Sequence, residues 1–492
     1  MGSTDDLPPQ MDLIDGQWRE PDLIRRDGDG SPRWIERASD GRPVQEQRAS
    51  DAAAIENALA VAARVHHEGV WSDTPVERRA ELLDEVAAHL QAAVPEVARL
   101  ESVTSGAVLS TTSMLGFILH GAFSLAAAQL REGVLSRRLD GTAGHPVEID
   151  RLPWGPALLL CPWNAPAPMA AHKAASALAA GAPVIIKPPE RAPHGTASIG
   201  AAALAAGLPD GVVQILHGGP EVATVLLADP RVASVSFTGG LVGGRAVAHA
   251  CAEGLKPAQL ELGGHGPLVV LDDADPSDVA LAVVSLLTTL NGQWCRALGR
   301  VLLPEARAQE YLDAITTALS QVRIGDPLDP TSQMGPMVHS EHLSMLQERL
   351  AGMVAAGGRP TAPTPLPQGP GNWMAPTLVD GLEPGTTRDE IFGPIASVHR
   401  YSTPDDAIDL ANGTDYGLEA YVLGADTDRA MQVARRIRAG EVKVNGVSPM
   451  NLHLMAPRPA FGLSGMHDEG TVETIEFFAG HRVVGVEGSI GS

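Results

Sequence analysis

The feature that most constrains the fold is an alternation of short apolar runs with alanine-rich stretches, which begins near residue 155. The apolar runs have the length and composition of strands, and the stretches between them have the length of helices. The predicted strands are Ala157–Cys161, Val184–Lys187, Val212–Leu216 and Val232–Phe237. The predicted helices are Met169–Ala180, Thr196–Ala206 and Glu221–Ala228. Strand–helix repetition of this kind predicts an α/β fold in which helices cover a parallel sheet.

The parts of the chain on either side extend this organisation. The amino-terminal part is predicted to be mostly helical, with Thr74 and Glu77 forming a capping box around Pro75 at the start of one helix. A second α/β stretch begins after Gly263. Residues 471–484 alternate enough to be a strand or an arm that reaches a partner subunit. A chain of 492 residues is long enough for two sizeable cores.

The charge balance excludes two classes of partner. The chain has 36 Lys and Arg residues against 59 Asp and Glu residues, a net charge of −23. An acidic surface repels nucleic acid and anionic membranes, so neither is expected as a partner. The opening MGSTDDLPPQ lacks the order of a signal peptide, and apolar runs such as Val279 to Leu290 are shorter than the roughly 20 residues that cross a bilayer.

The three cysteines have no spacing typical of metal ligands. The sequence therefore predicts neither a disulfide scaffold nor a metal site, and it favours a cytoplasmic protein.

The most specific local motif is NGQWC, residues 291–295. A cysteine in an apolar setting is ordinarily an inert core residue. The Gly-Gln step directly after an apolar run instead suggests a loop that presents the thiol of Cys295. No histidine lies beside it in the sequence, so a Cys/His protease has no local support. The residues alone leave both interpretations open, a core thiol and a nucleophile.

Two polar residues at predicted strand ends are candidates for further chemistry. Glu261 lies between two leucines, where a carboxylate is expensive to bury unless it is paired or used. It is either the partner of a neighbouring cation or a general base with a raised pKa. Asn164, in PWNAP, is either a turn residue or an amide donor, since parallel sheets place their sites at the carboxyl ends of strands.

Two more strand ends have the composition of cofactor contacts. The motif KPPE places Lys187 and Glu190 three residues apart in a rigid turn. The motif FTGG, residues 237–240, is followed by Gly243 and Gly244 and would let the backbone approach a pyrophosphate at the start of a helix. Either motif is also compatible with an ordinary turn. An ordered G-x-G-x-x-G is absent, so the common dinucleotide fingerprint does not apply.

Taken together, these motifs resemble the aldehyde dehydrogenase superfamily. The match runs from IDGQW, residues 14–18, to about Val484, in the order PWNAP, KPPE, FTGG, ELGG, GQWC, EIFGP and a late FGLSG. Glu261 and Cys295 are 34 residues apart (295 − 261), and Asn164 and Lys187 are 23 apart (187 − 164); both are spacings of the family. The resemblance implies an aldehyde dehydrogenase-like α/β fold of two parallel-sheet domains and a small β oligomerisation arm.

The resemblance also implies how the chain is divided and assembled. Residues 1–130 and 153–262 would form an NAD-binding domain, and residues 263–455 a catalytic domain. Residues 131–152 and 471–492 would form the oligomerisation arm. The family's dimers and tetramers imply a homodimer or homotetramer.

The implied reaction is the NAD-dependent oxidation of an aldehyde to the carboxylic acid through a cysteine thiohemiacetal and a thioester. Cys295 would attack as a thiolate, while the Asn164 amide and the Cys295 backbone N–H hold the oxyanion. Glu261 would activate the water that hydrolyses the thioester. Acyl-CoA-forming relatives typically lack a carboxylate at this position, so the resemblance favours hydrolysis. Lys173, nine residues after Asn164, matches a lysine that the family places near the base, as in a proton relay.

The cofactor residues follow from the same resemblance. Lys187 and Glu190 would grip the adenosine ribose, and the carboxylate would repel a 2′-phosphate, so NAD is predicted in preference to NADP. Glu390 would hold the nicotinamide ribose. The other cofactor residues would be Trp163, Phe237, Thr238, Gly239, Gly240, Leu262 and Phe392.

The substrate is expected to be a small-molecule aldehyde in an apolar, adaptable pocket. By their position in the family, the pocket residues would be Met169, His172, Trp294, Arg296, His453 and Met455. Packing behind the pocket is the alternative role for several of them. Arg296 either pairs with a substrate carboxylate, lowers the pKa of the thiol, or pairs with a carboxylate of the protein.

Some residues depart from the family pattern. Gly240 stands where a serine is usual, and His265 and the Leu290-Asn291 pair replace more typical residues. The late FGLSG lacks the expected glycine pair and lysine, in what is expected to be a loop near the substrate mouth. None of these changes removes a catalytic group.

Two functions compete with the one implied. One is a non-catalytic relative that keeps the fold as a structural or binding protein, against which the retention of Cys295, Glu261 and Asn164 argues. The other is a biosynthetic NAD(P)-dependent dehydrogenase dedicated to one semialdehyde.

Overall fold

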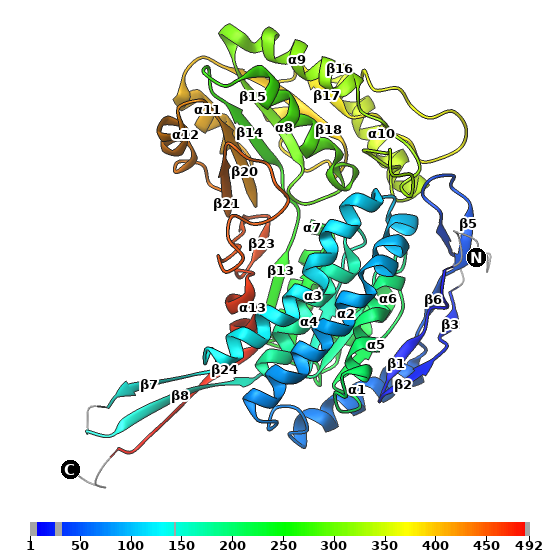
Figure 1. The fold of residues 1–492 in the computed structure, drawn as a ribbon, viewed down its shortest axis with the longest axis vertical. Coiled ribbons are helices and arrows are strands. Elements are labelled where there is room, and N and C mark those ends of the chain that lie inside the picture. The colour runs from blue at the N-terminus through cyan, green and yellow to red at the C-terminus, as the bar shows by residue number, and fades with distance from the viewer. Residues whose placement is uncertain (1–6, 25–31, 142–143, 488–492) are drawn as a thin grey trace.

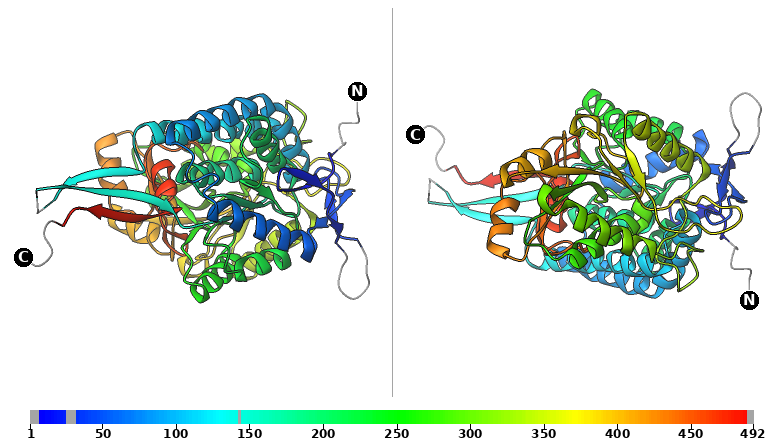
Figure 2. Two further views of the ribbon diagram at one scale, coloured as in Figure 1. Left: turned by 90° about the horizontal axis from the view of Figure 1, so that it is seen from below. Right: turned by 90° about the horizontal axis from the view of Figure 1, so that it is seen from above.

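The computed structural model describes residues 7–24, 32–141 and 144–487. Residues 1–6 of the predicted NAD-binding domain and residues 488–492 of the predicted oligomerisation arm lie outside these ranges. Two α/β bodies lie one above the other in Figure 1, and an arm of strands projects from the lower body. The first strands of the chain and the tip of the arm lie at opposite ends of the molecule (Figure 2).

The lower body contains an eight-stranded sheet in the order β2-β1-β11-β10-β9-β12-β13-β23. Its five central strands are parallel and are β9 (Ala157–Leu160), β10 (Val184–Lys187), β11 (Val213–Ile215), β12 (Ser234–Thr238) and β13 (Ala258–Glu261). The antiparallel edges are β1 (Asp12–Ile14) with β2 (Gln17–Arg19) on one side and β23 (Gly465–Met466) on the other. The predicted strands 157–161, 184–187, 212–216 and 232–237 are confirmed to within two residues at each end.

Helices cover both faces of this sheet because successive side chains of each strand point to opposite sides. Ala157 and Leu159 pack in one core and Leu158 and Leu160 in another. The first core is covered by α2 (Val76–Ser105), α3 (Leu109–Arg131), α4 (Pro166–Ala180) and α5 (Ala197–Ala205). The second is covered by α1 (Ala52–His67), α6 (Pro220–Ala228) and α7 (Leu241–Glu253).

The upper body has a seven-stranded sheet in the order β16-β17-β18-β15-β14-β20-β21, in which only β16 is antiparallel to its neighbour. Its strands are β14 (Gly266–Val270), β15 (Leu298–Pro304), β16 (Arg359–Thr361), β17 (Thr377–Asp380), β18 (Ile395–Tyr401), β20 (Glu419–Leu423) and β21 (Glu441–Val444). Its helices are α8 (Pro276–Thr288), α9 (Ala308–Ser320), α10 (Ser340–Ala355), α11 (Pro404–Ala411) and α12 (Thr427–Ala434). The predicted boundary at residue 263 falls between β13 and β14.

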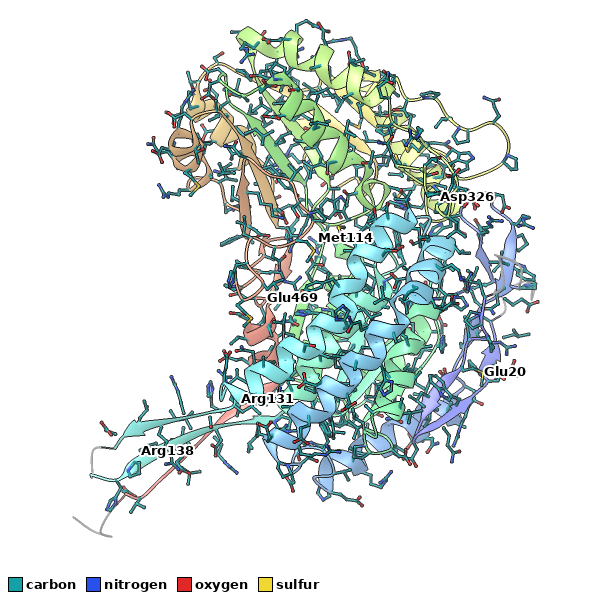
Figure 3. The ribbon with its side chains drawn as sticks, viewed as in Figure 1. Glu20, Met114, Arg131, Arg138, Asp326 and Glu469 are labelled. Atoms are coloured by element: carbon teal, nitrogen blue, oxygen red, sulfur yellow. The ribbon has the colours of Figure 1, made fainter. Side chains whose placement is uncertain are left out.

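The arm is a three-stranded antiparallel sheet in the order β24-β8-β7. It consists of β7 (Ser136–Asp140), β8 (Pro146–Pro153) and β24 (Ala479–Gly485). Arg138, labelled in Figure 3, lies on it well away from both bodies. The short two-stranded sheets pair β3 (Asp22–Leu23) with β6 (Arg48–Ala49), β4 (Trp34–Glu36) with β5 (Pro43–Glu46), and β19 (Tyr416–Gly417) with β22 (Phe461–Gly462). The expected α/β fold of two mostly parallel sheets and a small β arm is confirmed.

Three local predictions are wrong. The described residues before α1 contain the short strands β1 to β6, so the amino-terminal part is helical only from α1 onward. The capping box is absent, because Pro75 is the residue that caps α2 and the Thr74 hydroxyl donates instead to the Val70 carbonyl. Residues 471–484 are not one strand, since α13 (Thr471–Phe477) precedes β24.

Among the described helices, only α3 is long and apolar enough to cross a membrane. The sequence analysis did not predict this, because polar residues interrupt the apolar residues of α3. Its sequence includes polar residues such as His120 and Ser124, and half of its most apolar window is buried within the protein. It packs between α2 and α4. Its packing is that of a core helix, one side of which helps to line the main cavity.

Glu101 on α2 is a fully buried carboxyl group whose Oε1 accepts the backbone N–H of Ala167, at 2.7 Å, in the first turn of α4. Burial raises the pKa of Glu101 from 4.5 to about 8. Because the folded-state pKa is the higher one, the stabilising contribution of this group is complete below the unfolded-state pKa and is lost as the pH rises through about 8.

We therefore expect the free energy of unfolding to fall between about pH 5 and about pH 8, and to fall less in Glu101→Gln, which cannot ionise. Urea unfolding at several pH values in this window measures the difference. An identical pH dependence in the two proteins would contradict the assignment.

Candidate active site

A cavity of about 800 Å³ lies between the two bodies. Its floor is formed by segments that follow β9, β12 and β13, where the carboxyl ends of these parallel strands meet. Glu469, labelled in Figure 3, is on its wall at the junction between the bodies. This is the edge at which open α/β sheets bind their ligands.

The loop that carries Cys295 has an unusual backbone conformation. Three consecutive residues, of which the last is the glycine of GQWC, have positive φ, with Leu290 at 46°, Asn291 at 58° and Gly292 at 73°. Left-handed backbone is unfavourable for a residue such as leucine, so tertiary contacts must hold it. A Cβ at Gly292 would lie 2.6 Å from the backbone nitrogen of Pro394, so only glycine fits there.

Asn291 supplies those contacts, and it is one of the residues that depart from the family pattern. Its side chain is fully buried and makes three hydrogen bonds to two distant segments. The amide donates to the carbonyls of Gly106 and Pro336 at 2.8 and 2.9 Å, and its Oδ1 accepts from the Gly335 N–H at 2.7 Å. The Leu290-Asn291 pair therefore fixes the nucleophile loop to the rest of the protein.

Cys295 and Glu261 meet on the cavity wall. Glu261 ends β13 and Cys295 follows the left-handed turn, and each side chain affects the pKa of the other. Burial, together with the carboxylate of Glu469, raises the pKa of Glu261 to about 7. Burial and the Glu261 carboxylate also raise the pKa of the Cys295 thiol well above its usual range, while the Arg296 cation acts in the opposite direction. The resting pair is thus a thiol beside a carboxyl group able to take its proton near neutral pH.

Asn164 lines the same cavity, just before α4. Its Nδ2 donates to the backbone carbonyl of Gln293 at 2.9 Å, two residues before Cys295. An amide nitrogen carries two N–H groups, so one remains for an oxygen on a bound molecule. The bond to Gln293 fixes the Asn164 side chain beside the nucleophile loop.

Lys173 is fully buried behind the wall and does not itself line the cavity. Its Nζ donates to Ser236 Oγ and to Glu469 Oε1, both at 2.7 Å. Glu469 Oε2 in turn accepts from Arg458 Nη2 at 3.0 Å, and the two cations hold the pKa of Glu469 well below its usual range although burial acts to raise it. Lys173 therefore makes its ion pair with Glu469 and not with Glu261.

Sequence reasoning missed Glu469 and Arg458, which both line the cavity. Arg458 precedes and Glu469 follows the late FGLSG motif, residues 461–465, which was expected to be a loop near the substrate mouth. That expectation is wrong, because β23 pairs with β13 and sets Gly465 opposite Glu261. The predicted pocket residue His172 accepts a hydrogen bond from Arg458 Nη2 at 2.8 Å, and burial lowers the pKa of His172 to about 3, so it is neutral.

Arg296 lines the cavity, but its charge is already paired. Its Nε lies 2.9 Å from Glu419 Oε2, and its Nη1 lies 3.3 Å from Glu441 Oε2. Two of the roles left open by the sequence are supported, because Arg296 is paired with carboxylates of the protein and its cation also acts to lower the pKa of the Cys295 thiol. The role as an anchor for a substrate carboxylate stays a prediction.

The opposite end of the cavity is formed by the segment in which β12 leads into α7. Gly240 is the residue before α7, and no side chain caps the helix there. Thr238 Oγ1 is buried and lacks a hydrogen-bond partner, and a Cβ on Gly240 would meet no atom within 4 Å. An open helix N-terminus beside an unsatisfied hydroxyl fits the phosphates of a dinucleotide. Phe237, Gly239 and Leu262 also line this part of the cavity.

Glu190 lines the cavity, whereas its predicted companion Lys187 does not. Lys187 is buried behind the turn, donates to the carbonyls of Pro188 and Gly218 at 2.7 and 2.6 Å, and lies 3.8 Å from Glu190. Lys187 therefore supports the turn, and Glu190 is the residue of the pair that faces a ligand.

Glu390 enters the cavity opposite the nucleophile loop. Its Oε1 accepts the Gly264 N–H at 2.9 Å, and burial raises the pKa of Glu390 to about 7. A Cβ at Gly263 would overlap the Glu390 carboxylate, and one at Gly264 would overlap the Cys295 carbonyl. The glycine pair of ELGG thus allows both groups to approach β13.

Aromatic rings surround Glu390. The ring centroids of Trp163 and Phe392 are 5.3 Å apart, and Trp163 is also 5.3 Å from His342, which the sequence did not single out. Phe392 has a positive φ of 57°. All three residues line the cavity, beside Glu390.

The remainder of the cavity wall is apolar and is contributed largely by α3. The apolar residues of α3 that line the cavity are Leu115, Phe117, Ile118, Ala122 and Leu125. Met169 and Trp294 are on the wall as predicted, and Met450 and Leu454 lie on it as well. His453 and Met455, which were also predicted to line the pocket, belong to the same loop but do not line the cavity.

Comparisons with known proteins agree with this geometry. The family model described as "Aldehyde dehydrogenase family" matches residues 27–484. Geranial dehydrogenase from Castellaniella defragrans is 31% identical, over 87% of this chain and 90% of that protein. A peroxisomal aminoaldehyde dehydrogenase from Malus domestica is 32% identical, over 90% of this chain and 89% of its own.

Among solved structures, a mutant of aldehyde dehydrogenase C from Pseudomonas syringae, in complex with NAD+ and octanal, is 28% identical with a TM-score of 0.89. The similarity covers 97% of this chain and 98% of that one. The fold and the site define an oxidoreductase of the α/β class with a cysteine beside a dinucleotide cleft. The chain belongs to the aldehyde dehydrogenase family and is an NAD(P)-dependent aldehyde dehydrogenase.

Proposed function

We propose that this protein oxidises uncharged, apolar aldehydes to carboxylic acids with NAD, through a thioester on Cys295. The observation that carries the proposal is the cavity itself: Cys295 and Glu261 both line it, and apolar residues of α3 form another part of its wall.

The reaction begins with transfer of the Cys295 proton to Glu261, which has a pKa of about 7. The sulfur then forms a bond to the aldehyde carbon, and the carbonyl oxygen becomes an oxyanion. The second N–H of the Asn164 amide and the Cys295 backbone N–H would donate to that oxygen. Bound cofactor would accept the hydride, which leaves a thioester on Cys295.

Hydrolysis of the thioester needs a base beside the sulfur, and Glu261 is that base. Glu261 first releases to solvent the proton that it took from Cys295. As a carboxylate it then takes a proton from water, the resulting hydroxide attacks the thioester carbon, and the C–S bond breaks to release the acid and a thiolate, which recovers its proton from Glu261. Glu469 and Lys173 continue from Glu261 into the protein as a chain of ionised groups, which supports a role in passing the proton onward.

The adenosine end supports NAD in preference to NADP. Glu190 faces the cavity, and a carboxylate there would bond ribose hydroxyls and repel a 2′-phosphate. The two cations of this turn are both engaged, Lys187 with backbone carbonyls and Arg191 with Glu341. We expect a lower KM for NAD than for NADP. The reverse order in steady-state kinetics would overturn the cofactor assignment.

The paired charges of the substrate wall support an apolar substrate. Arg296 is held by two carboxylates, and Arg458 is held by Glu469 and His172, so the cations on this wall already have partners. Geranial and octanal, which occur in the names of two similar proteins, are apolar aldehydes that suit such a wall. Sequence identity alone does not favour them, because the relative named for aminoaldehydes is about equally similar. The charge pairing favours the first kind of substrate.

The test is a panel of aldehydes followed by NADH absorbance. Because a buried methylene contributes about 0.8 kcal/mol, we expect kcat/KM to rise about 3- to 4-fold per added methylene in straight-chain aldehydes until the channel is filled. Succinic semialdehyde and betaine aldehyde, which carry charges, should be poorer than octanal. Equal kcat/KM for octanal and either charged aldehyde would refute the apolar assignment. Absence of turnover with every aldehyde, despite NAD binding, would indicate a non-catalytic relative.

We also propose that the protein is a homodimer or homotetramer. The arm formed by β7, β8 and β24 exposes Leu139, Leu152, Val483 and Val484, an apolar surface of the kind that subunit contacts cover. Sedimentation equilibrium should give a mass at least twice the 51.3 kDa of the chain, and a monomer would contradict this proposal. A cytoplasmic location is proposed because the Cys295 thiol must remain reduced; fractionation of the source cells tests it.

A further inference from the structure

A cluster of four buried charges lies next to the nucleophile. It consists of Arg296, Glu419, Glu441 and Lys443, and is called here the charge cluster. Arg296 bridges Glu419 and Glu441, and Lys443 Nζ lies 2.5 Å from Glu419 and 3.7 Å from Glu441. The four side chains are between 1% and 12% exposed. Two cations thus balance two carboxylates in a nearly solvent-free site.

The strands explain why these residues lie together. Glu419 and Glu441 are directly paired on the parallel strands β20 and β21, and Lys443 is paired with Tyr421 two residues further on. Two carboxylates side by side would repel each other, so both cations are required between them. A buried ion cluster of this kind is seldom more stable than an apolar core of equal volume. Its presence therefore calls for a role other than stability.

Three members of the charge cluster also make hydrogen bonds to one short segment. Arg296 Nη1 donates to Asn451 Oδ1 at 3.0 Å, and Glu441 Oε1 accepts the Leu452 N–H at 2.6 Å. Lys443 Nζ donates to the Ser448 carbonyl at 2.7 Å. Residues 448–452, called here the mouth segment, contain no helix or strand. Three of the four charged residues thus hold a segment that has no regular backbone hydrogen bonds of its own.

The mouth segment forms part of the cavity wall through Pro449, Met450 and Asn451. Arg296 directly follows Cys295, and its carbonyl accepts the Tyr421 hydroxyl at 2.8 Å. The residue beside the nucleophile is therefore fixed by the same strands that support the wall. A substitution in the charge cluster would therefore change the width of the cavity beside the mouth segment.

We propose that the charge cluster positions the mouth segment and thereby determines which aldehydes reach Cys295. Arg296, Glu441 and Lys443 are positioning residues that act through Asn451, Leu452 and Ser448. The proposal rests on the proposed function only in assigning this part of the cavity to the substrate. It gives Arg296 a role in selectivity that involves no contact between its charge and a substrate charge.

The first experiment is hydrogen–deuterium exchange of the full-length protein without substrate. Glu441→Ala removes the acceptor of the Leu452 N–H, so we expect exchange in residues 448–452 to accelerate about 10-fold or more, with little change elsewhere. Asn451→Ala leaves all four charges in place and should give a smaller acceleration in the same residues, so it keeps the test valid if Glu441→Ala does not fold. Glu310→Ala, at an exposed carboxylate of α9 paired with Arg307, is the matched control and should leave the segment unchanged.

The second experiment compares octanal with acetaldehyde in Glu441→Ala, with Glu310→Ala as the control. We expect KM for octanal to rise about 10-fold with kcat within about 2-fold, and both constants for acetaldehyde to stay within about 2-fold, because a two-carbon aldehyde does not extend to the segment. Unchanged exchange in residues 448–452 would overturn the proposal, as would an equal rise of KM for both aldehydes. If the protein proves not to prefer apolar aldehydes, the exchange result still decides whether the cluster holds the segment.

Discussion

Cys295→Ala is expected to lower kcat by about 10⁴-fold or more while NAD binding is retained, because no other group of the site can form the thioester. Alanine lacks the thiol and its interaction with Glu261. It keeps the backbone N–H of residue 295 and the left-handed turn that precedes it. Cofactor binding depends on β12, α7 and Glu190, which the substitution does not touch. Activity and binding should therefore separate in this variant.

The measurement is NADH formation with octanal, beside NAD affinity from quenching of protein fluorescence. Cys251→Ala is the matched control, since Cys251 is buried in α7 away from the cavity and should keep kcat within about 2-fold. Residual turnover of Cys295→Ala within about 10-fold of the wild type would refute Cys295 as the nucleophile.

Glu261→Gln is expected to lower kcat by about 10² to 10³-fold and to abolish its dependence on pH near neutrality. In the wild type the active form of Glu261 is the carboxylate, and the pKa of this group is raised to about 7. The rate should therefore be low below this pH and rise as the pH increases through about 7. Glutamine keeps the size of the side chain and a hydrogen-bonding group, but it cannot accept a proton.

The pH profile of kcat needs the variant for its assignment, because the pKa of Glu390 is also raised to about 7. Loss of the limb near pH 7 in Glu261→Gln would assign it to Glu261. A variant that keeps a wild-type limb and kcat within about 10-fold would refute the role of Glu261 as the base. Glu390→Gln should instead raise the KM for NAD, as expected of a group on the cofactor side of the cavity.

Much of the fold could be predicted because its determinants are local. The strands from 157 to 238 are short apolar runs that end at glycine, proline or polar residues, and Gly181 ends α4 with a φ of 94°, as a glycine at that position does. The edges of the sheets were not predictable in this way. The strands β1 and β23 join the first sheet from opposite ends of the chain, and nothing in their two or three residues specifies that partner.

The candidate site divides along the same line. Cys295, Glu261, Asn164 and Glu190 occur in motifs whose spacing is visible in the sequence, and the structure brings them to one cavity. His453 and Met455 were chosen by position in a loop, and the choice is wrong because the backbone turns Met450, Asn451 and Leu454 toward the cavity instead. The side chains that face a cavity depend on the path of an irregular segment, and the sequence has no periodicity there to read.

The sequence by itself indicated the type of fold, the family and the candidate residues Cys295 and Glu261, because strand periodicity and short motifs encode them within a few residues. Only the tertiary structure decided the partners of the charged groups and the composition of the substrate wall. Arg296 finds Glu419 and Glu441 more than a hundred residues away, Glu469 joins Lys173 to Glu261, and α3 turns its apolar side into the cavity. The pKa of a buried group and the role of a charged one depend on such neighbours, since burial and pairing are properties of the folded chain.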